Sequence, residues 1–205
     1  WGVTIVRYVD GRTPLEVAEK ASIIPNQRRA PCSLQLKIKP FTAYIKSMPK
    51  PLTVHLGLDF TEMHRAERPK AEYEKVPGVT VDLPLLWEPV AKPPHRYAVE
   101  EWGIETPRLY KLGFPHNNCG GRCVRQGIKE WLRLKHTFPD RFTEVADWEQ
   151  EQRAKGGARA DYAIARDARG GTVKPMPLHD IHIVKGEQLP LGTSNEDVFS
   201  CFCSY

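Results

Sequence analysis

Leu52-Thr53-Val54-His55-Leu56-Gly57-Leu58-Asp59 is the stretch that decides the fold of this chain. It is a short run of apolar and β-branched residues that stops at a polar residue, which is typical of a buried strand followed by a loop. A second run of this kind spans residues 79–85. Strands that alternate with helical patterns favour a parallel sheet flanked by helices.

The segments before this strand carry one more strand pattern and two helix patterns. Val3–Tyr8 is short and β-branched and ends before Gly11-Arg12, so we expect a strand. Thr13-Pro14 predicts the start of a helix, with proline in the first turn. The next helix is expected from Cys32, and Pro40 is expected to kink it or split it in two.

The segments after it are mainly helical. Helices are expected over Arg96–Trp102 and Thr106–Leu112, from Arg122, and from Pro139-Asp140. Residues 156–171 are rich in Gly, Ala, Arg and Asp and lack an apolar period, so we expect a mobile connector. Leu178–Val184 is expected to form one short element.

These patterns predict an α/β fold with a three-layer arrangement, in which helices cover a parallel sheet. Three strands are few for such a sheet, and the chain does not begin with Met, so we expect the sheet to be incomplete at its N-terminal side. The α/β domain is expected over residues 1–155. Residues 156–205 are expected to be the connector and a C-terminal tail.

Composition narrows the class of protein. No stretch reaches the ~18 apolar residues that span a bilayer, and the N-terminus lacks the features of a secretory signal. The net charge of +5 favours an anionic partner such as a nucleotide or a nucleic acid. Five clustered cysteines without a secretion signal indicate a reducing, cytoplasmic setting, where cysteines bind metal or do redox chemistry.

Gly113-Phe114-Pro115-His116-Asn117-Asn118-Cys119-Gly120-Gly121-Arg122-Cys123 is the strongest local feature. Glycines let the backbone approach a cluster or an anion, and the N-terminus of a following helix favours thiolates. Cys119 and Cys123 are therefore either metal ligands or structural thiols. His116 and Asn117 either cap the helix or line a polar pocket.

Cys32 has two interpretations as well. It is either a small buried apolar residue or a thiolate favoured by a helix N-terminus beside Arg28 and Arg29. Zinc, held by the three cysteines together with His116, is the alternative metal.

Four ordered segments resemble sulfonucleotide reductases and related PP-loop proteins. Pro31-Cys32-Ser33 with Lys37 and Pro40 resembles their Cys–x₄–Lys–x₂–Pro segment, and His55–Asp59 with Glu62 and Arg65 resembles their Gly–x₄–Glu–x₂–Arg loop. Two further segments resemble the Pro-Leu-x-x-Trp strand and the region that ends in paired cluster cysteines, namely Leu83–Trp87 and Leu109–Cys123.

The resemblance to the phosphoadenosine-phosphosulfate reductase-like family covers roughly residues 1–135. It implies an adenine nucleotide alpha-hydrolase fold, an adenine nucleotide such as ATP or a sulfonucleotide, and a [4Fe–4S] cluster. By the same resemblance, the cluster ligands are Cys32, Cys119 and Cys123. The substrate-binding residues would be Lys37, Glu62 and Arg65, and we expect Arg28 or Arg29 to add contacts to phosphate or sulfate oxygens.

The chain departs from the family in two ways. Pro31 stands where cluster-bearing reductases have a second, adjacent cysteine, so a fourth ligand would come from the substrate, from Cys201 or Cys203, or from a non-cysteine group. The Ser-Gly-Gly-x-Asp-Ser phosphate loop is not found. The tail cysteines, Cys201 and Cys203, resemble the family's catalytic tail cysteine only in position.

The sequence therefore predicts an enzyme of adenine-nucleotide-dependent sulfur chemistry, which either transfers sulfur to an acceptor such as a nucleic acid or reduces a sulfonucleotide. A redox partner protein and a homo-oligomer are further expectations. The alternative is a non-catalytic binding or assembly protein on a degenerate PP-loop fold.

Overall fold

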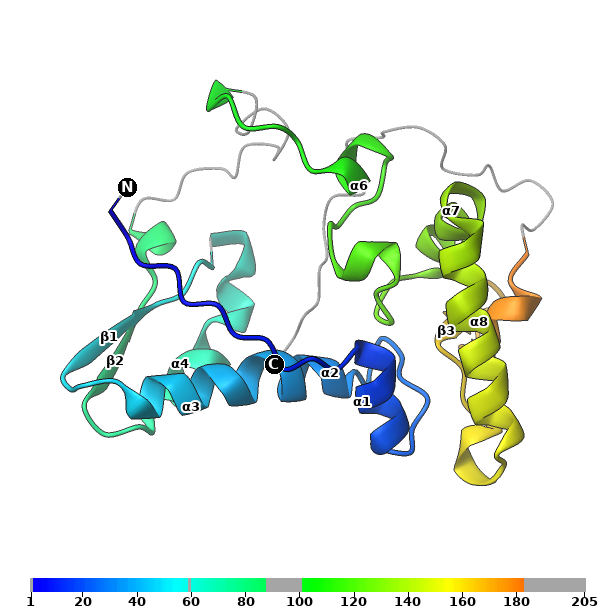
Figure 1. Cartoon of the computed structure of the whole chain (residues 1–205), viewed down its shortest axis with the longest axis horizontal. Coiled ribbons are helices and arrows are strands. Elements are labelled where there is room, and N and C mark those ends of the chain that lie inside the picture. The colour runs from blue at the N-terminus through cyan, green and yellow to red at the C-terminus, as the bar shows by residue number, and fades with distance from the viewer. Residues whose placement is uncertain (1, 59, 88–100, 183–205) are drawn as a thin grey trace.

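A computed structural model describes residues 2–58, 60–87 and 101–182. It is a mixed α/β structure, mostly helical, with a small two-stranded parallel sheet and a small antiparallel hairpin (Figure 1). The helices and strands in chain order are α1 (Pro14–Lys20), α2 (Pro31–Ser33), α3 (Lys39–Ser47), β1 (Leu52–His55), α4 (Glu67–Glu74), β2 (Val79–Asp82), α6 (Arg108–Lys111), α7 (Ile128–Thr137), α8 (Pro139–Ala154), β3 (Ala165–Asp167) and β4 (Lys174–Met176).

The two strands expected at 52–58 and 79–85 form a parallel pair, as predicted. Leu52 of β1 pairs with Val79 of β2, and Val54 pairs with Val81. The valines of this pair are buried together with Ile45 of α3 and with α4, whose tyrosine packs edge-on against an α3 ring. Both helices therefore cover the same face of the sheet.

The expected three-layer arrangement is wrong for the described residues. Side chains alternate along a strand, so the other face of the sheet carries the rungs Thr53–Thr80 and His55–Asp82. This face is polar and offers nothing apolar for a second helical layer to bury. The third strand, expected at Val3–Tyr8, does not form either, because its side chains lie in solvent.

The helix expected at Thr13-Pro14 begins as predicted. The Thr13 side chain accepts a hydrogen bond from the Glu16 backbone, and the Glu16 carboxylate accepts one from the Thr13 backbone. The helical stretch that starts at Pro31 runs on to Ser47 through a π-helical turn, Leu34–Ile38. Pro40 lies two residues after the end of this turn, so the predicted distortion takes the form of a wider turn rather than a break.

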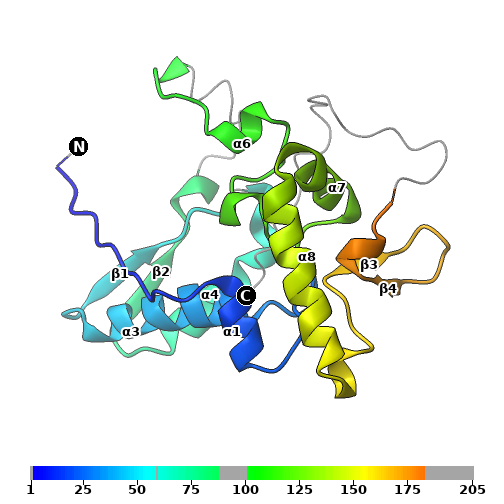
Figure 2. The same ribbon diagram turned by 45° about the vertical axis from the view of Figure 1, so that its right-hand side comes forward.

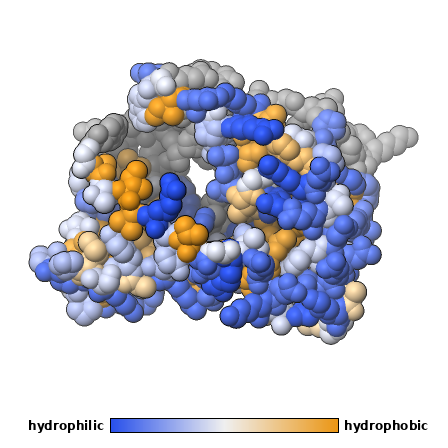
Figure 3. Space-filling model, in the orientation of Figure 1, coloured by the Kyte–Doolittle hydropathy of each residue, from blue (hydrophilic) through white to orange (hydrophobic). Residues whose placement is uncertain are grey.

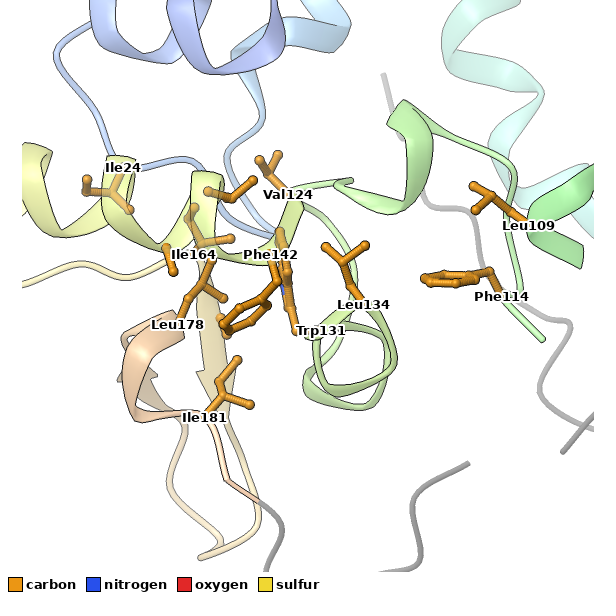
Figure 4. Packing of buried hydrophobic residues seen from close by; sticks show 13 residues of the cluster. Ile24, Leu109, Phe114, Val124, Trp131, Leu134, Phe142, Ile164, Leu178 and Ile181 are labelled. Carbon is orange, nitrogen blue, oxygen red and sulfur yellow. The ribbon is translucent and has the colours of Figure 1, made fainter. Parts of the chain in front are cut away.

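The main hydrophobic core lies at the other end of the molecule, where α7 and α8 pack together (Figures 1 and 2). Figure 4 shows Trp131 of α7 at its centre, next to Phe142 of α8. The helix expected from Arg122 begins only at Ile128, after extended Gly127, although Val124 in the intervening turn is still buried.

The stretch 156–171, expected to be a connector, contributes to this core. Ile164 is fully buried, and β3 pairs with β4 in an antiparallel hairpin. The buried residues of this stretch are alanines and one isoleucine. Their run is too short to appear as an apolar period in the sequence. The hairpin lies beside α8, on the side away from the parallel sheet (Figure 2).

Glu149 of α8 fixes the hairpin in place. Its two carboxylate oxygens accept hydrogen bonds from the backbone N–H groups of Ile164 and Leu178, each at 2.5 Å. The side chain is almost completely buried, and this burial raises the pKa of Glu149 above its usual value. Both ends of the 164–178 segment are thus held by one side chain.

Two expectations about elements lie partly outside the described residues. The helix expected at Arg96–Trp102 falls mostly within residues 88–100. The element expected at Leu178–Val184 is a 3₁₀ turn, Leu178–Asp180, as far as the described residues extend. None of the helices in the described ranges combines the length and the apolar character needed to cross a bilayer.

Glu149→Gln is predicted to lower stability by about 1–3 kcal/mol, because the amide NH₂ would face one of the two backbone donors. For a chain of this size, each kcal/mol lowers Tm by about 2–4 °C. Exposed Glu151→Gln on the same helix is the control and should leave Tm unchanged. Equal melting of both variants would contradict the role of Glu149.

The same carboxyl group predicts a pH dependence. Because its pKa is raised in the folded protein, folding favours the protonated carboxyl group. This stabilising contribution is complete below the ordinary pKa of 4.5, and it is lost as pH rises through the raised pKa. The difference in unfolding free energy between the wild type and Glu149→Gln should therefore shrink as pH rises from about 4.5. Denaturant unfolding across this range measures it.

Candidate functional site: a cationic pocket beside a pair of thiols

A cavity of about 300 Å³ opens at the carboxyl end of β1. The residues that line it come from the helical stretch before β1, from the loop after β1, and from the turn before α4: Ser33, Lys37, Ile38, Leu56, Gly57, Leu58 and Arg65. The carboxyl ends of parallel strands are the edge at which α/β proteins bind ligands. The cavity is therefore the best candidate for a binding site in the described residues.

Lys37 and Arg65 are the charged side chains of this cavity, and both are cationic. Lys37 is exposed to solvent, whereas the Arg65 side chain is only 18% exposed and forms a salt bridge with Glu62. Glu62 is not among the lining residues. It holds the Arg65 guanidinium, and its direct contact with a substrate stays a prediction of the sequence.

The local sequence explains how these residues meet. Lys37 and Ile38 follow Ser33 by four and five residues, which brings all three to one face of the π-widened helix. Gly57 lets the chain leave β1 without a side chain at the cavity wall. The walls are largely apolar, and the polar groups are a hydroxyl, an ammonium and a guanidinium, which together suit an oxyanion.

Cys32 lies between this cavity and the main core. It is half-buried, packs against the main core, and immediately precedes Ser33 of the cavity. Burial raises the pKa of the Cys32 thiol, the nearby Cys123 thiol raises it further, and the Lys37 ammonium opposes both effects. The Cys32 thiol thus adjoins the cationic cavity, and the Cys123 thiol lies near enough to influence its ionisation.

The predicted metal ligands do not form a ligand set. Among the described residues, no three His, Cys, Asp or Glu side chains are grouped so that they could hold a metal ion. Cys119 is exposed on its turn, whereas Cys32 and Cys123 are half-buried. The described residues therefore show no preformed metal site, and the three-cysteine iron–sulfur site and the zinc site with His116 stay predictions of the sequence.

The turn that carries Cys119 has an unusual backbone. Cys119, Gly120 and Gly121 all have positive φ, at 51°, 61° and 85°. A Cβ on Gly121 would lie 3.1 Å from the Leu134 side chain and 3.3 Å from the ring of Phe114. Glycine is thus required at position 121 both by the packing of the core and by the positive φ angle. The left-handed φ of Cys119 is strained, because this residue has a side chain.

The other predicted binding residues lie elsewhere. Arg28 and Arg29 are exposed on a turn whose backbone N–H groups donate to the Asn26 side chain. His116 is half-buried and Asn117 is exposed, and neither lines the cavity. The tail residues Cys201 and Cys203 lie outside the described residues.

Sequence reasoning missed two features near this edge. Ser33 lines the cavity, and its position next to Cys32 was the available signal. His55 and Asp82 form a pair across the sheet, with Nδ1 and Oδ2 3.2 Å apart. That pair depends on the register of β1 and β2, which no sequence pattern specifies.

A scan against protein-family models finds no match for this chain, and searches of curated proteins and of solved structures find none either. The family resemblance therefore rests on the four sequence segments alone.

Gly121→Ala is predicted to destabilise the protein by about 1–3 kcal/mol, because it combines a positive φ with a contact on the core. Gly170→Ala is the matched control, since its φ is not positive and its added Cβ would meet open space. Thermal unfolding of the two variants checks this. A Gly121 variant that melts with the control would show that this turn tolerates a side chain.

The Cys32 thiol is predicted to ionise only above its ordinary pKa of 9.0, since burial disfavours the thiolate. Its alkylation by iodoacetamide, followed by peptide mass spectrometry, should show a midpoint above that pH. Cys123→Ser should move the midpoint down, because it removes the neighbouring thiolate, whereas Cys119→Ser should not move it. A midpoint below 9.0 in the wild type would contradict this account.

Proposed function

We propose that this chain binds the anionic end of an adenine nucleotide, ATP or a sulfonucleotide, in the Lys37–Arg65 cavity and carries out nucleotide-dependent sulfur chemistry at the adjoining thiols. The observation that carries the proposal is that Lys37 and Arg65, far apart in the chain, line one cavity at the carboxyl end of β1. Both belong to segments that resemble the sulfonucleotide reductases.

The size and charge of the cavity support an oxyanion. A volume of about 300 Å³ is at the low end for small-molecule sites, which suits a phosphate or sulfate group with the remainder of the nucleotide toward solvent. The guanidinium of Arg65 can donate a pair of hydrogen bonds to such a group, while Lys37 supplies a second charge. The Glu62 carboxylate keeps the Arg65 fork in place before the ligand arrives.

The neighbouring thiols supply the sulfur part of the proposal. Cys32 precedes a residue of the cavity, and Cys123 lies close enough to influence its ionisation. A thiolate formed there could attack the sulfur of a sulfonucleotide held by Lys37 and Arg65. An S–S bond to the sulfonate would form while the S–O bond to the nucleotide phosphate breaks and the nucleotide leaves. No step is assigned to an iron–sulfur cluster, because the three cysteines do not form a ligand group.

Binding of ATP and of adenosine 5′-phosphosulfate, measured by isothermal titration calorimetry, tests the site. Lys37→Gln and Arg65→Gln are each expected to weaken binding by about tenfold or more, the equivalent of about 1.4 kcal/mol. Lys39→Gln and Arg68→Gln remove the same charges from exposed positions that do not line the cavity. These controls should bind like the wild type.

Equal losses in the cavity variants and the controls would mean that only the overall charge matters, and would overturn the proposed site. Binding that depends on Lys37 and Arg65 but is unaffected by Cys32→Ser, with no turnover of the sulfonucleotide, would favour the alternative of a non-catalytic nucleotide-binding protein.

A further inference from the structure

Two guanidinium groups converge on one aromatic ring, on a surface that is separate from the cavity. Phe138 lies between α7 and α8. The Cζ atom of Arg108 in α6 is 5.2 Å from the centre of its ring, and that of Arg141 in α8 is 4.5 Å from it. Three elements thus place two cations on a single phenylalanine.

The arrangement extends into the core behind it. The Phe138 ring stacks on Phe114 at 6.3 Å, with 27° between the ring planes, and Arg133 lies over Phe114 at 5.8 Å. Phe114 is buried in the main core. The Phe138 ring beneath the two outer arginines is therefore anchored, which reduces the conformational entropy that the arginines lose when they bind a ligand.

The two outer arginines keep their charge available. Neither Arg108 nor Arg141 forms a salt bridge with a carboxylate in the described ranges, although Asp140 precedes Arg141 in sequence. Arg141 donates one hydrogen bond to the Gly120 carbonyl at 3.0 Å, out of the five N–H donors that a guanidinium has. Nearby Lys111 and Arg122 are by contrast paired with Glu105 and Glu144.

The surface around Phe138 carries both charged and apolar side chains. Figure 3 shows strongly hydrophilic side chains next to hydrophobic surface in the region of α6. Arginine guanidiniums held on an aromatic ring suit a nucleic-acid strand, because the guanidinium edges donate hydrogen bonds to phosphates while the guanidinium faces stack on bases. An acidic peptide would use the charge but offers no planar partner for the guanidinium faces.

We propose that the Arg108–Phe138–Arg141 platform binds a single-stranded nucleic acid through its phosphates and bases. The Gly120 carbonyl that Arg141 holds belongs to the same turn as exposed Cys119, so the bound strand would pass beside the cysteine segment. Binding to the platform does not depend on the proposed function.

Fluorescence anisotropy with a labelled single-stranded RNA tests the proposal on the full chain. The double variant Arg108→Gln/Arg141→Gln should weaken binding by about tenfold or more and reduce the slope of log Kd against log salt by about one to two. Arg68→Gln on exposed α4 is the single-charge control and should cost little. Phe138→Leu keeps both arginine charges but removes the aromatic ring on which they lie, so it should also weaken binding.

Thermal unfolding of every variant shows whether the fold is retained, and nucleotide calorimetry on the double variant separates this surface from the cavity. Retained nucleotide binding with lost RNA binding supports the platform even if the proposed chemistry fails. RNA affinity that is absent in the wild type, or unchanged in the double variant, overturns the proposal. Equal binding of poly-glutamate with the same dependence on both arginines would assign the surface to an acidic protein instead.

Discussion

The parallel pairing of β1 with β2 is the constraint on which the candidate site depends. Two parallel strands cannot be joined by a tight turn, so the chain must cross over between them, and here the crossover contains α4. The crossover and α3 then bury the same face of the sheet through Val54, Val81 and Tyr73. Because both strands end at the same edge, the loop after β1, the helical stretch before it and the turn before α4 meet there, and the cavity forms between them.

This small sheet stays one-sided because its second face is polar. The rungs Thr53–Thr80 and His55–Asp82 give a further helix nothing to bury. Most of the hydrophobic burial is instead in the cluster of α7, α8 and the hairpin, where Glu149 satisfies two backbone donors that would otherwise be buried without partners. The cavity thus lies on the thin sheet, whereas the thiol segments are attached to the helical core.

Cys32 connects these two parts. It packs against the helical core and adjoins the cavity, so its ionisation is affected by burial from one side and by Lys37 from the other. The turn with Cys119 is also attached to the core, through Gly121, and to the arginine platform, through Gly120. The cavity thus adjoins one cysteine segment, and the arginine platform adjoins another.

The sequence by itself determined the elements whose signals are local. These are the capped helix at Thr13, the two valine-rich strands, the distortion at Pro40 and the helix from Pro139. It also indicated Lys37 and Arg65, whose motifs place them near a strand end. Only the tertiary structure decided that Glu62 holds Arg65, that Gly121 of the Cys119 turn packs on the core, and that two arginines share Phe138. Local periodicity reports that a segment is buried but not what it packs against, and these features all depend on contacts between elements.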